Sequence, residues 1–153
     1  MTIKIGDKFP AFELLNEQSK NINIADFLGK TPLIIYFYPK NETFNCTKQA
    51  CYFRDDYSKF KNLNCEIIGI SSDSPKSHLS FKKNHQLPFT LLSDKSGKIR
   101  KKLAIPTNLL GILPGRITFV INNKGTVIQI IDSAVNMKKH IEEAIHFLKK
   151  DNQ

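Results

Sequence analysis

The sequence predicts an α/β fold in which a mixed β-sheet is flanked by helices. Leu33–Tyr38 and Cys65–Ser71 are short apolar runs rich in β-branched or aromatic residues, as buried strands are. Between them, in residues 46–62, apolar side chains recur every three or four positions, which is typical of a helix with one buried face. A hairpin pattern at 117–131 supplies two more strands. Strands that alternate with helices and then form a hairpin belong to this fold class.

The N-terminal segment predicts a small β-hairpin extension of the sheet. Ala11–Leu15 is a strand candidate, Asn16–Lys20 is polar turn material, and Ile22–Leu28 follows it. The central strand ends at Pro39, because proline cannot donate to a ladder of hydrogen bonds.

The second half of the chain continues the alternation of strands and helices. Ser74-Pro75 starts a helix, since serine caps a helix N-terminus and proline favours its first position. We expect this helix to reach about residue 85. A short strand at 89–92, a short helix at 94–103 and an amphipathic helix at 136–150 follow the same reasoning. The order of all these elements is that of the thioredoxin fold.

Length, charge and hydropathy limit the function. The chain has 153 residues, which fits one domain over 1–153. It carries 23 Lys and Arg against 14 Asp and Glu, but the basic residues are scattered, so we expect no nucleic-acid partner. No apolar run approaches the roughly 20 residues that span a bilayer, so we expect no membrane partner. No secretory signal is visible, so we expect a cytoplasmic protein.

Cys46 is the candidate reactive residue. It follows a buried strand and a short loop, and it falls in the first turn of the predicted helix. There the free N–H groups and the helix dipole favour a thiolate. A helix start usually faces solvent, so we expect Cys46 to be accessible; the alternative is a buried, inert thiol. Thr43 can point its hydroxyl into the same pocket, or serve only as the helix cap.

Several blocks of the sequence resemble the peroxiredoxin family. Pro39, Thr43 and Cys46 have the spacing of its active-site motif, Pro-x-x-x-Thr-x-x-Cys. The run from Cys46 to Cys51, with the Phe-Arg-Asp that follows, is similar to the peroxiredoxin Q or bacterioferritin comigratory protein subfamily. The resemblance extends over residues 3–148, where three further blocks match in order: Ile70–Pro75, Leu87–Asp94 and Leu113–Ile121.

The resemblance implies a thiol peroxidase that reduces hydrogen peroxide and organic hydroperoxides without a metal or organic cofactor. Cys46 would be the peroxidatic cysteine, whose thiolate attacks the O–O bond and becomes a sulfenic acid. Thr43 would orient the peroxide, Arg116 would stabilise the thiolate and the developing charge, and Pro39 would shield the sulfenic acid. The N–H groups of Asn45 and Cys46 would complete the cradle. Without the motif, Arg116 would be interpreted as a surface arginine.

The resemblance also implies partners and one departure from the family. Thioredoxin or a similar dithiol would be the reductant, and the protein would be a monomer. The family usually has Pro-Gly between the threonine and the peroxidatic cysteine, where this chain has Phe44-Asn45. We expect Phe44 at the pocket rim to affect which hydroperoxide is preferred.

By the same resemblance, Cys51 would be the resolving cysteine. Five residues of helix separate two Cα atoms by roughly 8–9 Å, whereas a disulfide needs at most about 7 Å. The start of the helix, at about residues 45–52, would therefore unwind to form the Cys46–Cys51 disulfide. In the alternative, Cys51 packs in the core and an external thiol resolves Cys46. Cys65 opens a strand, and we expect it to pack in the core.

Two other functions remain open at this point. One is a thiol–disulfide oxidoreductase on the same fold, although no Cys-x-x-Cys motif is present. The other is a non-enzymatic basic binding or chaperone-like module. The spacing of the four histidines fits no zinc site with a cysteine, so we expect them to be solvated or half-buried.

Overall fold

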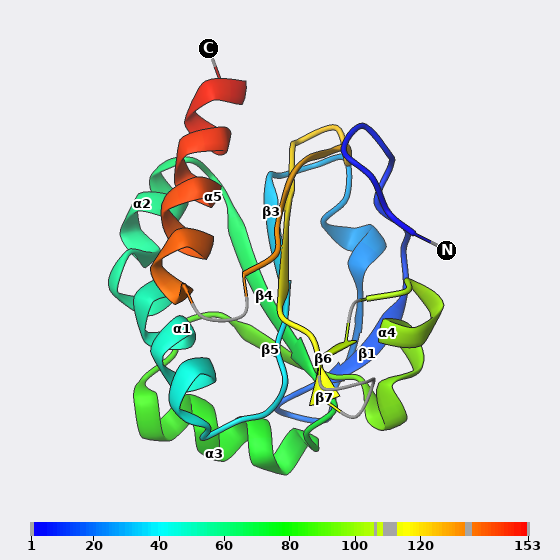
Figure 1. The fold of residues 1–153 in the computed structure, drawn as a ribbon, viewed down its shortest axis with the longest axis vertical. Coiled ribbons are helices and arrows are strands. Elements are labelled where there is room, and N and C mark those ends of the chain that lie inside the picture. The colour runs from blue at the N-terminus through cyan, green and yellow to red at the C-terminus, as the bar shows by residue number, and fades with distance from the viewer. Residues whose placement is uncertain (1, 106, 109–112, 134–135, 153) are drawn as a thin grey trace.

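The computed structural model describes residues 2–105, 107–108, 113–133 and 136–152. Within them, seven strands form one sheet (Figure 1), in the order β2-β1-β5-β4-β3-β8-β9. The strands of this sheet are β1 (Glu13–Asn16), β2 (Asn21–Asn23), β3 (Leu33–Phe37), β4 (Glu66–Ser71), β5 (Thr90–Ser93), β8 (Ile117–Ile121) and β9 (Val127–Ile131). Two short strands, β6 (Thr107–Asn108) and β7 (Leu113–Pro114), pair with each other apart from it. The predicted mixed sheet is confirmed.

β3 lies in the interior of the sheet, between β4 and β8. It pairs in parallel with β4 and antiparallel with β8, and β4 pairs in parallel with β5. All five residues of β3 are buried, because both faces of the strand are covered. β1 and β2 form an antiparallel hairpin, and β1 joins the sheet beside β5. The expected N-terminal hairpin extension is therefore present.

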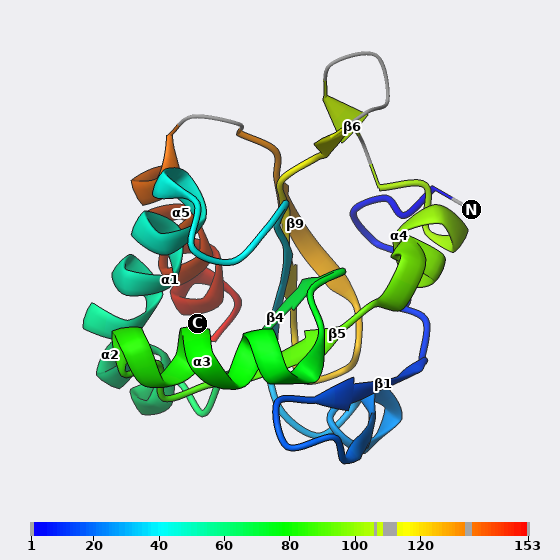
Figure 2. The same ribbon diagram turned by 90° about the horizontal axis from the view of Figure 1, so that it is seen from below.

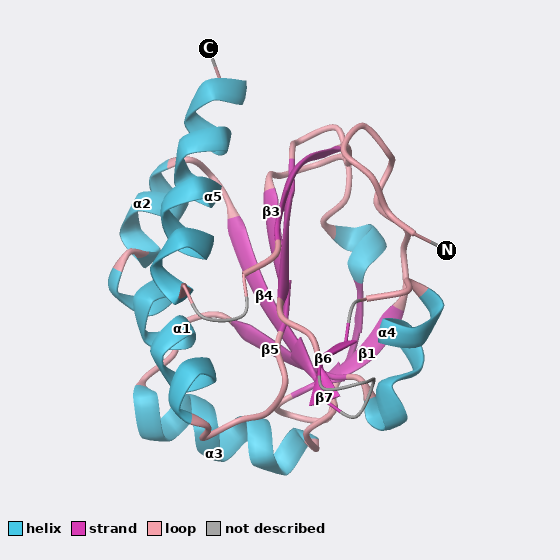
Figure 3. Cartoon of the chain, in the orientation of Figure 1, coloured by secondary structure: helices cyan, strands magenta, loops and turns pink. Residues whose placement is uncertain are grey.

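Helices cover the sheet on both sides (Figure 3). One face packs against α1, α2, α3 and α5 around residues such as Tyr36, Phe53 and Ile141. The other face packs against the N-terminal segment, the 3-10 helix η1 and α4 around residues such as Ile35, Phe119 and Ile24. The bounds of these elements are η1 (Ile24–Asp26), α1 (Phe44–Asp55), α2 (Tyr57–Asn62), α3 (Pro75–His85), η2 (Lys95–Gly97), α4 (Lys98–Lys102) and α5 (Met137–Asp151).

The helix predicted over 46–62 is two helices. α1 ends before Asp56, whose backbone has φ −100° and ψ 11°, and α2 begins at the next residue. The break leaves Phe53 and Phe60 both fully buried, with ring centroids 5.7 Å apart. The apolar spacing that predicted one helix is therefore kept across the break, and the spacing alone could not reveal it.

The predicted start of α3 is confirmed. Pro75 is its first residue, and the hydroxyl oxygen of Ser74 accepts a hydrogen bond of 3.1 Å from the N–H of Ser77. Asn136 caps α5 in the same way, because its side-chain oxygen accepts a hydrogen bond from the N–H of Lys139. Over the described ranges, no helix is long and apolar enough to cross a membrane.

The parallel strands β3, β4 and β5 end at one edge of the sheet. Ser71 at the end of β4 lies beside Ser93 at the end of β5, and the N–H of Tyr38 continues the pairing by donating to the carbonyl of Ile70. Ligand sites in open α/β sheets are typically found at this edge. The loops that leave it carry the candidate active site.

Candidate active site

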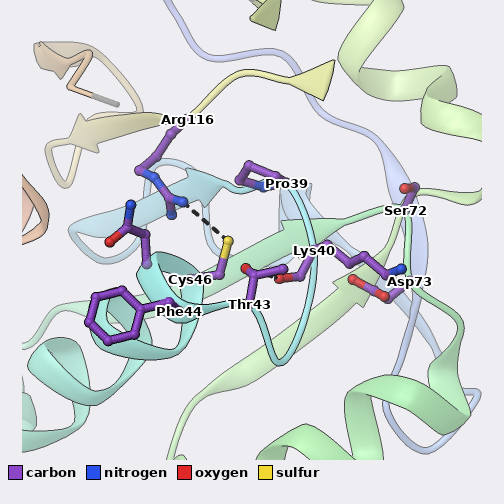
Figure 4. A pocket seen from close by; sticks show the side chains of 9 residues that line it. Pro39, Lys40, Thr43, Phe44, Cys46, Ser72, Asp73 and Arg116 are labelled. Carbon is purple, nitrogen blue, oxygen red and sulfur yellow. Dashed lines mark hydrogen bonds between the residues drawn. The ribbon is translucent and has the colours of Figure 1, made fainter. Parts of the chain in front are cut away.

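A cavity of about 730 Å³ opens where the loop after β3 enters α1 (Figure 4). Pro39 and Thr43 come from this loop, Cys46 from the first turn of α1, and Arg116 from the segment before β8. The structure thus brings together four of the five predicted catalytic residues; Cys51 is not among the described residues that line the cavity. Among the described residues, Lys40, Phe44, Asn45, Ser72 and Asp73 also line it.

Cys46 is the third residue of α1. Its exposed fraction is 1%, so the expectation that it faces solvent freely is wrong. It is nevertheless one of the residues that line the cavity. The helix start packs into the core around Ala50 and Phe53. The first-turn position, with its unpaired backbone N–H groups, matches the prediction.

Thr43 is the N-cap residue of α1 by its backbone. Its φ of −82° and ψ of 156° are extended, and its carbonyl accepts from the N–H of Thr47. Its side chain does not cap the helix; the hydroxyl donates to the carbonyl of Lys40 at 2.8 Å. With its proton committed, the oxygen of this hydroxyl retains acceptor capacity at the cavity.

Arg116 contacts Cys46 directly. Its Nη2 donates to Sγ of Cys46 at 3.2 Å, and its Nη1 donates to Oε1 of Gln49. The exposed fraction of Arg116 is 6%. A buried cation this close to the sulfur interacts strongly with negative charge that develops there, because little solvent screens it. Arg116 is therefore not the surface arginine that its local sequence would indicate.

Gln49 is a residue of the site that no sequence motif indicates. It lies on α1 three residues after Cys46, on the same side of the helix, and it is fully buried. The Nε2 of Gln49 has no hydrogen-bond partner among the described residues, whereas its Oε1 accepts from Arg116. A polar residue within the apolar face of a helix was the signal that could have revealed it.

A buried network that the sequence did not reveal holds the loop before α1. The N–H of Asn41 donates to Asp73 at 2.9 Å, and its side chain meets Tyr38 and Ser77. His78 completes the network: its Nε2 lies 3.0 Å from the carbonyl of Leu92, so its Nδ1 accepts from the amide of Asn41. This network fixes the loop that carries Pro39 and Thr43 onto α3.

The expectation of solvated or half-buried histidines is wrong for His78 and His140. Both are fully buried, and burial lowers the pKa of each below its ordinary value. Thr118 satisfies His140 at 2.7 Å, and the carbonyl of Ser133 satisfies its other nitrogen at 2.8 Å. Both are therefore structural, neutral residues. Over the described ranges, no group of His, Cys, Asp and Glu is placed to hold a metal ion.

The three cysteines are free thiols in this structure. Cys46 and Cys51 both belong to α1, which is continuous across them, and Cys51 is partly exposed. Cys65 is fully buried beside the start of β4, its thiol donates to the carbonyl of Glu66, and burial raises its pKa. The environment of Cys65 agrees with the expected core position.

Phe44 replaces the usual proline of the motif and is strongly exposed. Its exposed fraction is 80%, and its ring points away from Cys46 (Figure 4), with the ammonium group of Lys48 5.9 Å from its centroid. The side chain therefore forms part of the rim and does not fill the cavity.

Comparisons with known proteins find relatives that match most of this chain. The model of the AhpC/TSA family matches residues 5–130. Chloroplastic peroxiredoxin Q from Gentiana triflora is 49% identical over 143 residues, which cover 94% of this chain and 65% of that protein. The corresponding protein of Populus jackii is 48% identical, with 94% and 67% covered. The chain thus spans about 65% of the length of the first relative.

Solved structures show the same fold. Peroxidoxin BcpB from Mycobacterium tuberculosis superposes with a TM-score of 0.88 at 31% identity, with 97% of each chain covered. A cysteine-to-serine mutant of PrxQ from Xylella fastidiosa gives a TM-score of 0.89 at 25% identity, with 100% and 99% covered. The fold and the site define a peroxiredoxin, and the chain belongs to the AhpC/TSA family. Within that family, its relatives are peroxiredoxin Q proteins.

The expectation of a cytoplasmic protein is wrong. It depended on the lack of a visible targeting signal, but the peroxiredoxin Q relatives are named as chloroplastic proteins.

Proposed function

We propose that the protein is a thiol peroxidase that reduces hydrogen peroxide and organic hydroperoxides. The observation that carries the proposal is the contact between Arg116 and Cys46 at the base of a cavity beside Thr43. A buried guanidinium stabilises the negative charge that develops on the peroxide oxygens.

The first step is nucleophilic. The Cys46 thiolate attacks one peroxide oxygen, the O–O bond breaks, and the leaving oxygen takes a proton to become water or an alcohol. The sulfur is thereby oxidised to a sulfenic acid. Thr43 accepts the hydrogen bond of the peroxide O–H, since its own proton is held by the carbonyl of Lys40. Pro39 covers the sulfenic acid from the other side of the cavity.

The second step is resolution by Cys51. Its thiol attacks the sulfenic sulfur, a disulfide forms and water leaves. Because α1 is continuous across both cysteines, its first turns must unwind before the sulfurs can meet. A dithiol reductant such as thioredoxin then reduces the disulfide. No metal or organic cofactor takes part.

The test is peroxide consumption with a thioredoxin system, using the wild-type chain, Cys46→Ser and Cys65→Ser. We expect Cys46→Ser to abolish turnover and Cys65→Ser to retain it, because Cys65 is buried away from the cavity. Turnover by Cys46→Ser would refute the proposal. Rapid reduction of a protein disulfide without peroxide would favour the oxidoreductase alternative instead.

A further inference from the structure

The carboxylate of Glu42 joins the loop before α1 to the end of α3. Glu42 directly precedes Thr43, the N-cap residue of α1. Its Oε1 accepts from Nε2 of His85 at 2.7 Å, and its Oε2 accepts from the side-chain amide of Asn84 at 2.8 Å. Asn84 and His85 are the last two residues of α3, which ends on the side of the sheet where α1 lies (Figure 2). We call Glu42, Asn84 and His85 the clamp.

The α3 side of the clamp is firmly placed. The ring of His85 packs edge-on against that of Phe81, with centroids 5.1 Å apart, and Phe81 is fully buried. The carbonyl of His85 accepts a hydrogen bond of 2.8 Å from Nη1 of Arg54, in the last turn of α1. The end of α3 therefore contacts both the loop that enters α1 and the far end of α1.

The backbone of Glu42 has an unfavourable conformation. Its φ is 61°, in the left-handed region that a residue with a Cβ adopts at a cost in free energy. Such a conformation persists only where the surrounding structure imposes it. The hydrogen bond from His85, and to a smaller extent that from Asn84, lowers the pKa of Glu42, which favours the ionised form that accepts both. The clamp thus supplies the contacts that hold this conformation.

The clamp lies next to the turns of α1 that must unwind. Cys46 and Cys51 cannot meet while the helix is continuous across them. The first helical hydrogen bond runs from the N–H of Thr47 to the carbonyl of Thr43. Unwinding of this turn frees the backbone beside Glu42, which can then leave its left-handed conformation. Contacts that fix Glu42 therefore stabilise the wound helix relative to the unwound one.

We propose that Glu42 is a positioning residue that keeps the first turns of α1 wound through its hydrogen bonds to Asn84 and His85. The wound helix holds Cys46 at the cavity for reaction with peroxide, and the unwound helix lets Cys46 meet Cys51. The clamp thereby sets the balance between oxidation and resolution. This inference rests on the proposed function and adds a regulation of the same site.

Hydrogen exchange in the reduced protein measures the unwinding without peroxide. We expect the backbone amides of residues 44–52 to exchange about fivefold faster in Glu42→Ala than in the wild-type chain, which is the upper range for loss of an exposed charged pair. Glu42→Gln keeps one oxygen that can accept from the clamp and should give an intermediate rate. Glu66→Gln is the matched control, because it breaks the 2.6 Å ion pair with Lys61, outside α1, and should leave this exchange unchanged.

The second readout is the fate of Cys46 after excess hydrogen peroxide. Its sulfenic acid either reacts with Cys51 to form a disulfide or with a second peroxide to form a sulfinic acid. Easier unwinding favours the disulfide, so Glu42→Ala should lower the sulfinic share about fivefold. A merely structural ion pair would not move this share, and Glu66→Gln should therefore leave it at the wild-type value.

Asn84→Ala tests the clamp from the α3 side. Alone, it should speed the exchange of residues 44–52 less than Glu42→Ala does, because His85 still donates to the carboxylate. Combined with Glu42→Ala, it should add nothing, since its partner is already lost. Additive effects of the two substitutions would overturn the clamp.

The exchange measurement separates this inference from the peroxidase proposal. Faster exchange in Glu42→Ala than in Glu66→Gln supports the clamp even if the wild-type chain consumes no hydrogen peroxide, a result that would sink only the peroxidase function. Equal exchange in these two variants overturns the clamp even if hydrogen peroxide is consumed. An equal sulfinic share in the two variants of an active peroxidase would also overturn it.

Discussion

Replacing Arg116 by methionine should slow the reaction with peroxide by about 100- to 1,000-fold. The Nη2 of Arg116 lies 3.2 Å from Sγ of Cys46. At an effective dielectric constant of about 20, unit charges at this distance interact by at most about 5 kcal/mol. Loss of one preorganised donor from an anion-stabilising site usually costs about 3–4 kcal/mol, which corresponds to that change in rate.

The assay is stopped-flow measurement of the second-order rate constant of reduced protein with hydrogen peroxide. Arg116→Lys should give an intermediate rate, because lysine keeps the charge but cannot contact both Cys46 and Gln49 as the forked guanidinium does. Circular dichroism checks that α1 remains folded in both variants. A rate for Arg116→Met within about threefold of the wild-type rate would refute the reasoning.

Three further predictions concern the surroundings of the site. Gln49→Glu should pair Arg116 with a carboxylate and place a negative charge one turn from Cys46. Alkylation of Cys46 by iodoacetamide at neutral pH should therefore slow about tenfold. Gln49→Met, which adds no charge, should slow the alkylation less, and the reverse order of the two variants would contradict this role of Gln49. Cys51→Ser should complete the first oxidation but lose turnover with thioredoxin, and mass spectrometry should find sulfinic acid after excess peroxide; full turnover would mean that an external thiol resolves the intermediate. Burial lowers the pKa of His78 below 6.5, so the unfolded chain binds a proton at a higher pH than the folded chain does. The free energy of unfolding should therefore fall as the pH drops below 6.5. Urea unfolding should show a smaller fall in His78→Asn, and an unchanged fall would show that other groups determine this pH dependence.

The parts of the fold predicted from sequence are those with strong local signals. The run Leu33–Tyr38 is typical of a buried strand, and Ser74-Pro75 marks a helix start by its capping chemistry. The break at Asp56 was missed because the apolar spacing continues across it. β6 and β7 could not be predicted, because strands of two residues each are too short to show an alternating pattern.

The residues of the site likewise fall into those that local sequence predicts and those that it does not. Thr43 and Cys46 are close in sequence, so the end of a strand and the start of a helix predict their neighbourhood. Arg116 is 70 residues from Cys46, and only the family resemblance connected them. The contacts of Gln49 and Asn41 depend on how α1, α3 and the loops pack, which no local pattern encodes.

The histidines show a further limit of sequence patterns. His78 was expected near solvent, yet it is buried because Asn41 and the carbonyl of Leu92 satisfy both ring nitrogens. A buried polar residue depends on partners brought from elsewhere in the chain. The pattern of its own helix carries no information about them.

The most direct test of the account is a tryptic map after one equivalent of hydrogen peroxide, without reductant. Trypsin cleaves after Lys48 and therefore separates Cys46 from Cys51. We expect the peptides 41–48 and 49–54 to be joined by a disulfide, which requires that the start of α1 unwinds. Cys46 oxidised to a sulfenic or sulfinic acid with Cys51 free would contradict the two-cysteine cycle, and an untouched Cys46 would contradict the peroxidase function itself.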